Sequence, residues 1–318
     1  MKTNTMTARV DAFLAERQAL GFCSTGPTAS QLHSFDKFFD EAGHQVPLTI
    51  DSVVLWARDC ARIGDPRTWA RRLEALRPFA AYLSRNDADT EFPETQIFGK
   101  PKRRATPHIY SEAEVLALLK AARDLPPEDG LRLSTYEAFF GLIAATGLRV
   151  SEAINLRCDD VDLNQRCLMV RMTKFKKSWY VPFHPTVADA LGDYLGVRDR
   201  FLSRMPEQAF FVSPKLGPLK SRVVHWTFQK MREHARVIAR GAYPAVRIHD
   251  FRHTFICRRI QSWQANGTDI DNAIAALSTY VGHAKISDTY WYLTGIPDLM
   301  AVAGNKFERF AMGGAEHD

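Results

Sequence analysis

Apolar residues recur at helical spacing in four consecutive segments near the N-terminus, each with polar residues on its other side. Pro66 suits the first position of the fourth segment, whereas Pro78 predicts a kink or a break inside it. Four short amphipathic helices predict a small helical bundle over residues 1–90. The segments span residues 7–21, 28–43, 49–64 and 65–85.

The helical periodicity is lost over residues 91–110, which carry three prolines and the basic run "KPKRR". A stretch of this kind predicts a linker between two domains. The clustered cations match the pattern expected of contacts to DNA phosphates, although a solvated basic surface is the simpler interpretation. These cations are Lys100, Lys102, Arg103 and Arg104.

A second domain is predicted over residues 111–318. Ser111 and Glu114 have the spacing of a capping box, so a helix should begin there. The pattern then stays mainly helical, except that "CLMVRMT" and "SWYVPF" flank "KFKK" and predict a β-hairpin over residues 167–183. The fold class is therefore mainly α, with an N-terminal four-helix bundle and an α-rich domain that holds a small antiparallel sheet.

Composition narrows the class of protein. The 318 residues suffice for two domains, and 46% hydrophobic with 25% charged residues is ordinary for globular proteins. Neither a long apolar run nor a signal-type leader is found, so we expect a cytoplasmic protein. The five cysteines are scattered without a C-x-x-C pair, which indicates neither a disulfide framework nor a zinc site. We expect no cofactor.

The net charge of +6 is compatible with a polyanionic partner but does not prove one. Its distribution is more informative, because residues 230–259 hold eight Lys and Arg residues against two acidic ones. Such clustering favours a nucleic acid as the partner.

Two motifs could bind a phosphate or transfer a proton. In "TGLRVSEAINL", Arg149 and Glu152 are three residues apart; they could form a surface ion pair or a carboxylate-fixed phosphate clamp. The hairpin turn "TKFKK" holds Lys174, Lys176 and Lys177. A solvated turn is the common outcome there, but a lysine at a hairpin tip could also donate a proton to DNA.

"IHDFRHTF" and "VGHAKISDTYWYLTG" add histidines and tyrosines. His249 and Arg252 lie three residues apart, on one helical face. His249, His253 and His283 could be considered as metal ligands, but the neighbouring Arg252 and the missing zincin glutamate argue against a metal. Two tyrosines follow on one predicted helix and point about 200° apart, so one could pack while the other faces a site. They are Tyr290 and Tyr292.

Taken in chain order, these motifs resemble the boxes of the tyrosine recombinases of the phage integrase family, the Xer-like group in particular. "TGLRVSEAINL" is similar to the first arginine box, "HDFRHTF" to the H-x-x-R box, and "VGHAKISDTYWYL" to the G-H box with its nucleophile nine residues later. The resemblance spans about Ser111 to Leu293. It implies that the N-terminal bundle is a core-binding, SAM-like domain.

The resemblance also implies roles for individual residues. Tyr292 would be the nucleophile, with Tyr290 the alternative, and Lys174 the general acid, with Lys176 or Lys177 the alternatives. Opening a phosphodiester develops charge on its oxygens, which two guanidiniums can hold without a metal. Those residues are Arg149 and Arg252, with His249 as the base, His283 as a donor to the phosphate and Glu152 in support.

The resemblance implies a nucleoid-associated enzyme that closes around double-stranded DNA, forms a 3′-phosphotyrosine and assembles as a tetramer on two sites. Helper proteins or partner recombinases, and a tail helix after residue 295 that packs on its own core or on a neighbour, belong to the same expectation. The sequence context favours integration, excision or transposition of a mobile element. Two alternatives stay open: a catalytically silent accessory recombinase, and a type IB topoisomerase-like enzyme.

Overall fold

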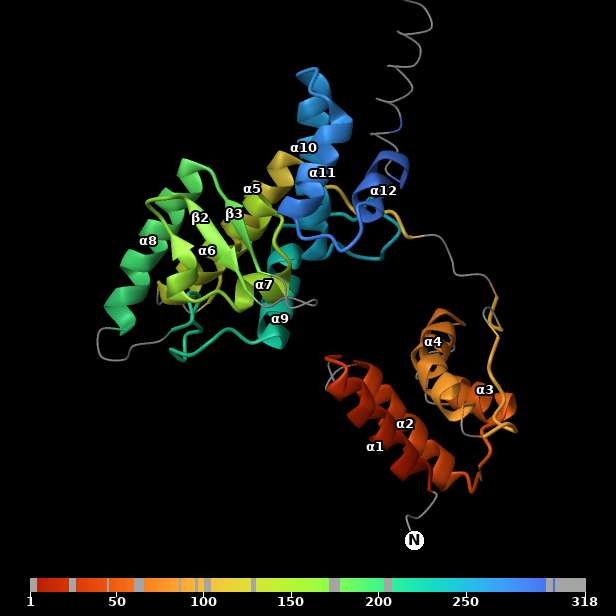
Figure 1. The fold of residues 1–318 in the computed structure, drawn as a ribbon. Helices are drawn as coiled ribbons and strands as arrows, with labels where there is room; N and C mark the ends of the chain where they lie inside the picture. Colours follow the sequence, from red (N-terminus) through yellow and green to blue (C-terminus); the bar gives the residue numbers. More distant parts are fainter. Residues whose placement is uncertain are drawn as a thin grey trace, which may run out of the picture. The chain divides into compact units, whose positions relative to one another are not determined.

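The computed structural model describes residues 5–22, 27–44, 46–59, 66–85, 87–94, 97–99, 104–126, 130–171, 178–202, 208–295 and 300. The chain divides into two compact units, Met1–Arg103 and Arg104–Asp318 (Figure 1). Among the described residues, no helix combines the length and the apolar character that a bilayer span requires.

The first unit is a bundle of helices around an aromatic core. Phe35 and Trp56 meet edge to face at its centre, and both are fully buried. The four predicted helices are confirmed, and α4 continues through Pro78, so the alternative of a break is wrong. Phe79 and Ala80, directly after the proline, have no exposed surface, and this burial outweighs the missing hydrogen bond. The helices are α1 (Met6–Ala19), α2 (Pro27–Glu41), α3 (Ile50–Asp59) and α4 (Pro66–Leu83).

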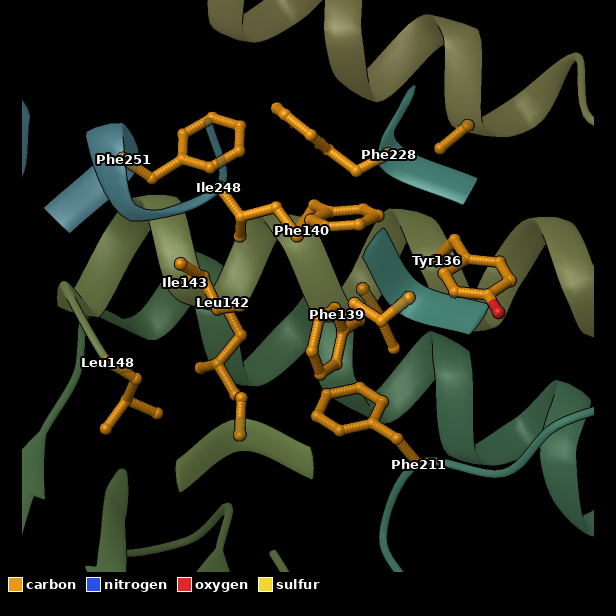
Figure 2. Packing of buried hydrophobic residues seen from close by; sticks show 14 of the residues in the cluster. Tyr136, Phe139, Phe140, Leu142, Ile143, Leu148, Phe211, Phe228, Ile248 and Phe251 are labelled. Atoms are coloured by element: carbon orange, nitrogen blue, oxygen red, sulfur yellow. The ribbon is translucent and has the colours of Figure 1, made fainter. Parts of the chain in front are cut away.

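The second unit is built around α6 (Leu131–Thr146), which is apolar on most of its surface and is packed against α5, α8 and α10. Figure 2 shows how side chains of α6 meet Phe228 of α9 and Phe251 of α10. Because most of α6 is buried, it holds the elements that precede and follow it in place. The other helices are α5 (Glu112–Arg123), α7 (Val150–Ile154), α8 (Pro185–Leu202), α9 (Ser221–His234), α10 (His249–Ala265), α11 (Ile270–Tyr280) and α12 (Ser287–Gly295), with a 3-10 turn at Cys158–Asp160.

A three-stranded antiparallel sheet lies beside this helical core. The predicted hairpin is confirmed as β2 (Cys167–Val170) and β3 (Trp179–Pro182), with Cys167 opposite Pro182. A further short strand, β1 (Val161–Asp162), pairs with β2 and was not predicted. Leu168 is buried in the α6 core, so one face of the sheet is part of it.

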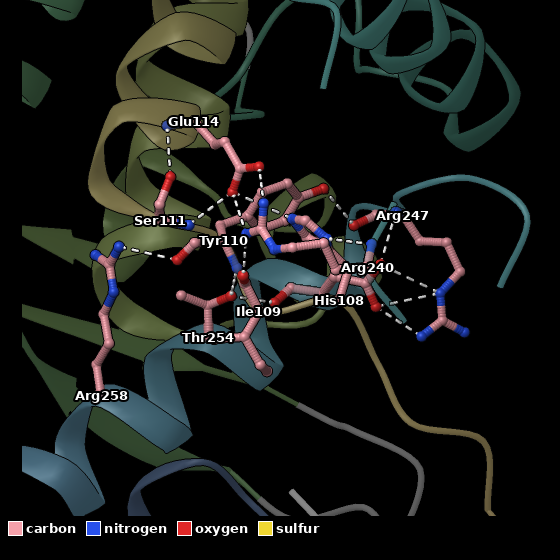
Figure 3. A network of polar contacts seen from close by, with 10 residues as sticks. His108, Ile109, Tyr110, Ser111, Glu114, Arg240, Arg247, Thr254 and Arg258 are labelled. Carbon is pink, nitrogen blue, oxygen red and sulfur yellow. Dashed lines mark hydrogen bonds and ion pairs between the residues drawn. The ribbon is translucent and has the colours of Figure 1, made fainter. Parts of the chain in front are cut away.

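The residues just before α5 pack onto α10 (Figure 3). The backbone N–H of Tyr110 donates to Thr254 Oγ1 at 2.8 Å, and the Tyr110 hydroxyl donates to the Arg247 carbonyl at 3.1 Å. His108 and Tyr110 are 2% and 1% exposed, so the last residues of the expected linker, 91–110, are part of the second core. The chain before α5 therefore helps to fix the N-terminal part of α10 and the residues just before it.

The capping box at the start of α5 is confirmed. The backbone N–H of Ser111 donates to Glu114 Oε2 at 2.7 Å, and the N–H of Glu114 donates to Ser111 Oγ at 3.2 Å. Two amide groups that the first turn leaves unpaired are thereby satisfied.

Candidate active site

Arg149 is positioned by the end of α6. Gly147 closes that helix in the left-handed conformation, with φ of 70°, and the ring of Phe255 lies where a side chain would otherwise stand. Arg149 then precedes α7, where Glu152 holds it twice: Oε2 accepts its backbone N–H at 2.8 Å and Oε1 accepts Nη1 at 2.6 Å. The predicted Arg149–Glu152 pair therefore exists, and its carboxylate is 5% exposed.

Arg252 lies on the first turns of α10 and is 2% exposed. Its Nη1 donates to the Gly147 carbonyl at 2.8 Å, and its Nη2 donates to the Val281 carbonyl. Arg149 Nη2 donates to the adjacent Gly282 carbonyl at 3.0 Å. The two guanidiniums are thus held by neighbouring carbonyls of one turn, between α11 and α12.

These two cations carry more charge than their surroundings neutralise. Arg149 has Glu152 as its ion-pair partner, whereas no carboxylate of the described residues forms an ion pair with Arg252. Burial, and then the charge of Arg149, lower the pKa of Arg252 to about 10, which leaves it charged at neutral pH. A buried, fixed guanidinium of this kind favours binding of an anion such as a phosphate.

Three histidines line the same region, and all are held neutral near pH 7. His249 keeps an exposed side, but partial loss of water and then the charges of Arg252 and Arg247 lower its pKa to about 4. Burial and then Arg252 lower the pKa of His283 to about 3. His283 Nδ1 lies 2.7 Å from Thr289 Oγ1, so a buried hydroxyl of α12 fixes its ring.

None of these histidines belongs to a cluster with metal-site geometry. Within the described parts of the chain, no group of three or more His, Cys, Asp or Glu side chains could hold a metal ion. The functional groups that the structure brings together here are cations, neutral imidazoles and a phenol.

The two tyrosines of α12 differ sharply in surroundings. Tyr292 is 1% exposed, with its ring stacked near His283, whereas Tyr290 is 37% exposed. The Tyr292 hydroxyl is hydrogen-bonded to Nδ1 of His253 at 2.7 Å. Burial raises the pKa of Tyr292 above its usual value, so the phenol is protonated until it reacts.

Arg104 lies against the same helix from outside. Its guanidinium stands 4.6 Å from the ring centre of Trp291 and 3.8 Å from a carboxylate oxygen of Asp288. The end of the basic run is therefore linked to the helix that carries both tyrosines. The other predicted lysines and arginines lie outside the described residues: Lys100, Lys102, Arg103, Lys174, Lys176 and Lys177.

The hairpin is nevertheless tied to the site through β3. Trp179, which begins β3, donates its Nε1–H to the Tyr280 carbonyl at 3.1 Å. Its ring also covers Gly282, where an added Cβ would collide with it. The strand that follows the lysine turn is thus packed on the turn that holds both arginines.

His253 is the residue that sequence reasoning missed. In the sequence it was considered only as a metal ligand, and rejected, whereas it contacts the Tyr292 hydroxyl. Its spacing from His249, one helical turn, carried the signal, since residues i and i+4 share a face. The spacing could not show that Tyr292 of α12 would contact that face.

Comparison with known proteins provides evidence that does not depend on the geometry of the site. The model of the "Phage integrase family" matches residues 109–295, more than half of the chain. The chain is 34% identical over 312 residues to the integrase/recombinase y4rB of Sinorhizobium fredii, covering 96% of this chain and 98% of that protein. It is 30% identical to tyrosine recombinase XerC of Chlamydia caviae, covering 77% and 73% of the two chains.

A solved structure shares the fold over nearly the whole chain. The Tn1549 transposon integrase, in complex with transposon right end DNA, superposes with a TM-score of 0.67. The two share 15% sequence identity, and the match covers 95% of this chain and 99% of the other. At that identity the likeness establishes the fold.

Proposed function

We propose that Tyr292 is the nucleophile of this protein. The chain belongs to the phage integrase family of tyrosine recombinases, which cleave and rejoin DNA strands in site-specific recombination. The phenolic oxygen of Tyr292 attacks the phosphorus of one phosphodiester. The bond from phosphorus to the 5′ oxygen breaks, and a 3′-phosphotyrosine forms. A 5′-hydroxyl from another strand later reverses the step and reseals the DNA.

The observation that carries this proposal is the pair of fixed guanidiniums beside a buried tyrosine. Arg252 has no ion-pair carboxylate among the described residues, and a phosphate between it and Arg149 would balance that charge. In the transition state, charge grows on the non-bridging oxygens, where preorganised donors stabilise it most. Glu152 supports this arrangement by fixing Arg149.

Proton transfers complete the mechanism. Tyr292 must lose its proton as it attacks, and His249, neutral near pH 7, is the proposed acceptor. His283 donates to the phosphate. Lys174 is the proposed acid that protonates the leaving 5′ oxygen; Trp179, five residues later in the sequence, packs on Gly282.

Each of the two units is proposed to contact the DNA around the cleaved bond. The basic residues Lys100, Lys102, Arg103, Arg104, Lys176 and Lys177 supply contacts to its phosphates. Exchange between two duplex sites requires four strand cleavages, so we propose a tetramer in which each protomer contributes one tyrosine. The near full-length similarity to an integrase/recombinase and the fold shared with a transposon integrase favour a mobile element as the biological context, within the cytoplasm.

A covalent adduct tests the proposal. DNA flanking the gene, nicked to trap intermediates, is mixed with the wild type, Tyr292→Phe and Tyr290→Phe, and resolved on a denaturing gel. We expect an adduct with the wild type and Tyr290→Phe and none with Tyr292→Phe. DNA that is bound without any adduct would point to a silent accessory recombinase. Relaxation of any supercoiled plasmid by a monomer would point to a topoisomerase.

A further inference from the structure

The hydroxyl of Tyr292 has a partner that the mechanism above does not use. His253 Nδ1 lies 2.7 Å from Tyr292 Oη, and the ring centres are 5.6 Å apart. His253 is 5% exposed, and its neighbour His249 meets it edge to face at 4.8 Å. The contact thus connects the second turn of α10 to the middle of α12 in a place that water hardly reaches.

We propose that His253 is a positioning residue for the nucleophile: its Nδ1 accepts the hydrogen bond of the Tyr292 hydroxyl and fixes that oxygen beside the two arginines. The proposal rests on the proposed function of Tyr292. It assigns to His253 a role through Tyr292 and no contact with DNA. Tyr290 is exposed and makes no hydrogen bond to a histidine among the described residues, so the same contact would select which tyrosine reacts.

The surroundings of His253 favour an acceptor over a base. Burial, followed by His249, Arg247, Arg104 and Arg252, lowers its pKa to about 2. An imidazole so disfavoured as a cation stays neutral. The proposal requires the tautomer with the proton on Nε2, which leaves a free lone pair on Nδ1. Such an imidazole can orient the phenol, but it is a poor final acceptor for the phenol's proton.

Orientation of this kind has a large kinetic effect. Rotation of a tyrosine side chain about its Cα–Cβ bond displaces the phenolic oxygen, and a displacement of about 1 Å from the attacking position costs on the order of 100-fold in rate. The hydrogen bond restricts that rotation. Trp291 and His283, whose rings lie 5.2 and 6.5 Å from that of Tyr292, pack beside its ring, and the hydrogen bond to His253 adds a directional contact at the reacting oxygen itself.

Two variants separate orientation from other roles. In His253→Asn the side-chain oxygen stands near the position of Nδ1 and can accept the same hydrogen bond, whereas His253→Leu keeps similar bulk and accepts nothing. His184→Leu, at an exposed histidine before α8, is the matched control. Single-turnover adduct formation is measured on a nicked DNA, alongside the dissociation constant for uncleaved DNA.

We expect His253→Leu to lower the rate on the order of 100-fold, with DNA affinity within about twofold of the wild type. His253→Asn should recover most of the rate. A substrate with sulfur in place of the leaving 5′ oxygen needs no acid, and it should leave the His253→Leu defect unchanged because the defect lies with the nucleophile. Three results would overturn the proposal: a full rate with His253→Leu, no recovery with His253→Asn, or affinity falling in parallel with rate.

A DNA-free measurement keeps the test independent of cleavage. Chemical unfolding of the wild type, His253→Leu, Tyr292→Phe and the double variant forms a double-mutant cycle. The penalty of His253→Leu should shrink when Tyr292→Phe has already removed the hydroxyl; strictly additive effects would refute the contact. If the wild type forms no adduct while the cycle shows coupling, the proposed function fails and the contact stands.

Discussion

At the scale of single residues, the site is defined by charge that is fixed before DNA arrives. Arg252 donates to two backbone carbonyls, whose partial charges orient the guanidinium without neutralising it. A lysine would keep the charge but could not span two carbonyls and a phosphate with one planar group. The geometry of the guanidinium is therefore as important as its charge.

Arg252→Lys is accordingly expected to lower adduct formation by about 100-fold or more, the range found when a preorganised donor to a developing oxyanion is removed. The measurement is single-turnover cleavage of nicked DNA. Arg259→Lys, an exposed position on the same helix, is the control and should cleave within about twofold of the wild type. An Arg252→Lys variant with an unchanged rate would show that charge alone is sufficient.

The buried histidines make stability depend on pH. His253 and His283 have pKa values lowered to about 2 and about 3, so the folded protein leaves them neutral where the unfolded chain protonates them. Their stabilising contribution is present above the unfolded pKa near 6.5, and it decreases progressively as the pH falls below it.

His253→Asn should therefore flatten the pH dependence of stability. We expect the slope of unfolding free energy against pH, between about pH 4.5 and 6, to fall by roughly 1.4 kcal/mol per pH unit, the effect of one proton. Urea unfolding at a series of pH values measures it, with His184→Asn as the matched control. A slope equal to that of the wild type would mean that His253 is protonated in the folded protein.

At the scale of elements, local sequence patterns were sufficient to predict the features that neighbouring residues determine. The capping box at Ser111 and the hairpin over residues 167–183 were predicted because propensity and spacing within a few residues decide them. β1 was missed because a two-residue strand is too short to show periodicity. It is stabilised by its pairing with β2. The contact of His253 with Tyr292 joins residues 39 positions apart, which periodicity cannot reveal.

The turn between α11 and α12 depends on a glycine for two separate reasons. Gly282 has φ of 65°, and an added Cβ would collide with Trp179. Gly267 has nearly the same φ, 69°, but open space around it. Substituting each glycine by alanine therefore distinguishes two costs. Both substitutions impose the backbone strain of a left-handed residue, about 1–2 kcal/mol, but only the one at Gly282 adds the collision with Trp179.

Gly282→Ala is expected to destabilise the protein by more than Gly267→Ala, by at least about 1 kcal/mol beyond the shared strain, and to slow cleavage about tenfold or more. Urea unfolding and adduct formation measure the two effects. Trp179→Leu combined with Gly282→Ala should recover part of the rate, because the collision is relieved. Equal effects of the two glycine substitutions would mean that the hairpin does not hold this turn.

At the scale of the whole molecule, the boundary between the two compact units falls between Arg103 and Arg104, inside the stretch from which composition and punctuation predicted a linker. Residues 91–110 were expected to form a linker, yet His108 and Tyr110 are buried and belong to the second core. The partners of Tyr110 on and just before α10 lie more than 130 positions away, which no local pattern contains. The basic run consequently stands at the boundary between the two units.

Binding of DNA by both units should depend steeply on salt, because each phosphate that a cation neutralises releases counterions. Replacing Lys100, Lys102 and Arg103 together by alanine is expected to flatten the slope of log K against log salt by about 0.9 for each phosphate that is no longer neutralised, up to about 2.7. Equilibrium binding to duplex DNA at several salt concentrations measures the slope. Lys120→Ala, which removes one exposed cation on α5, is the control for the effect on the slope of losing one charge outside the basic run. A triple variant whose slope matches the wild type would remove the basic run from the DNA interface, whatever its effect on affinity at one salt concentration.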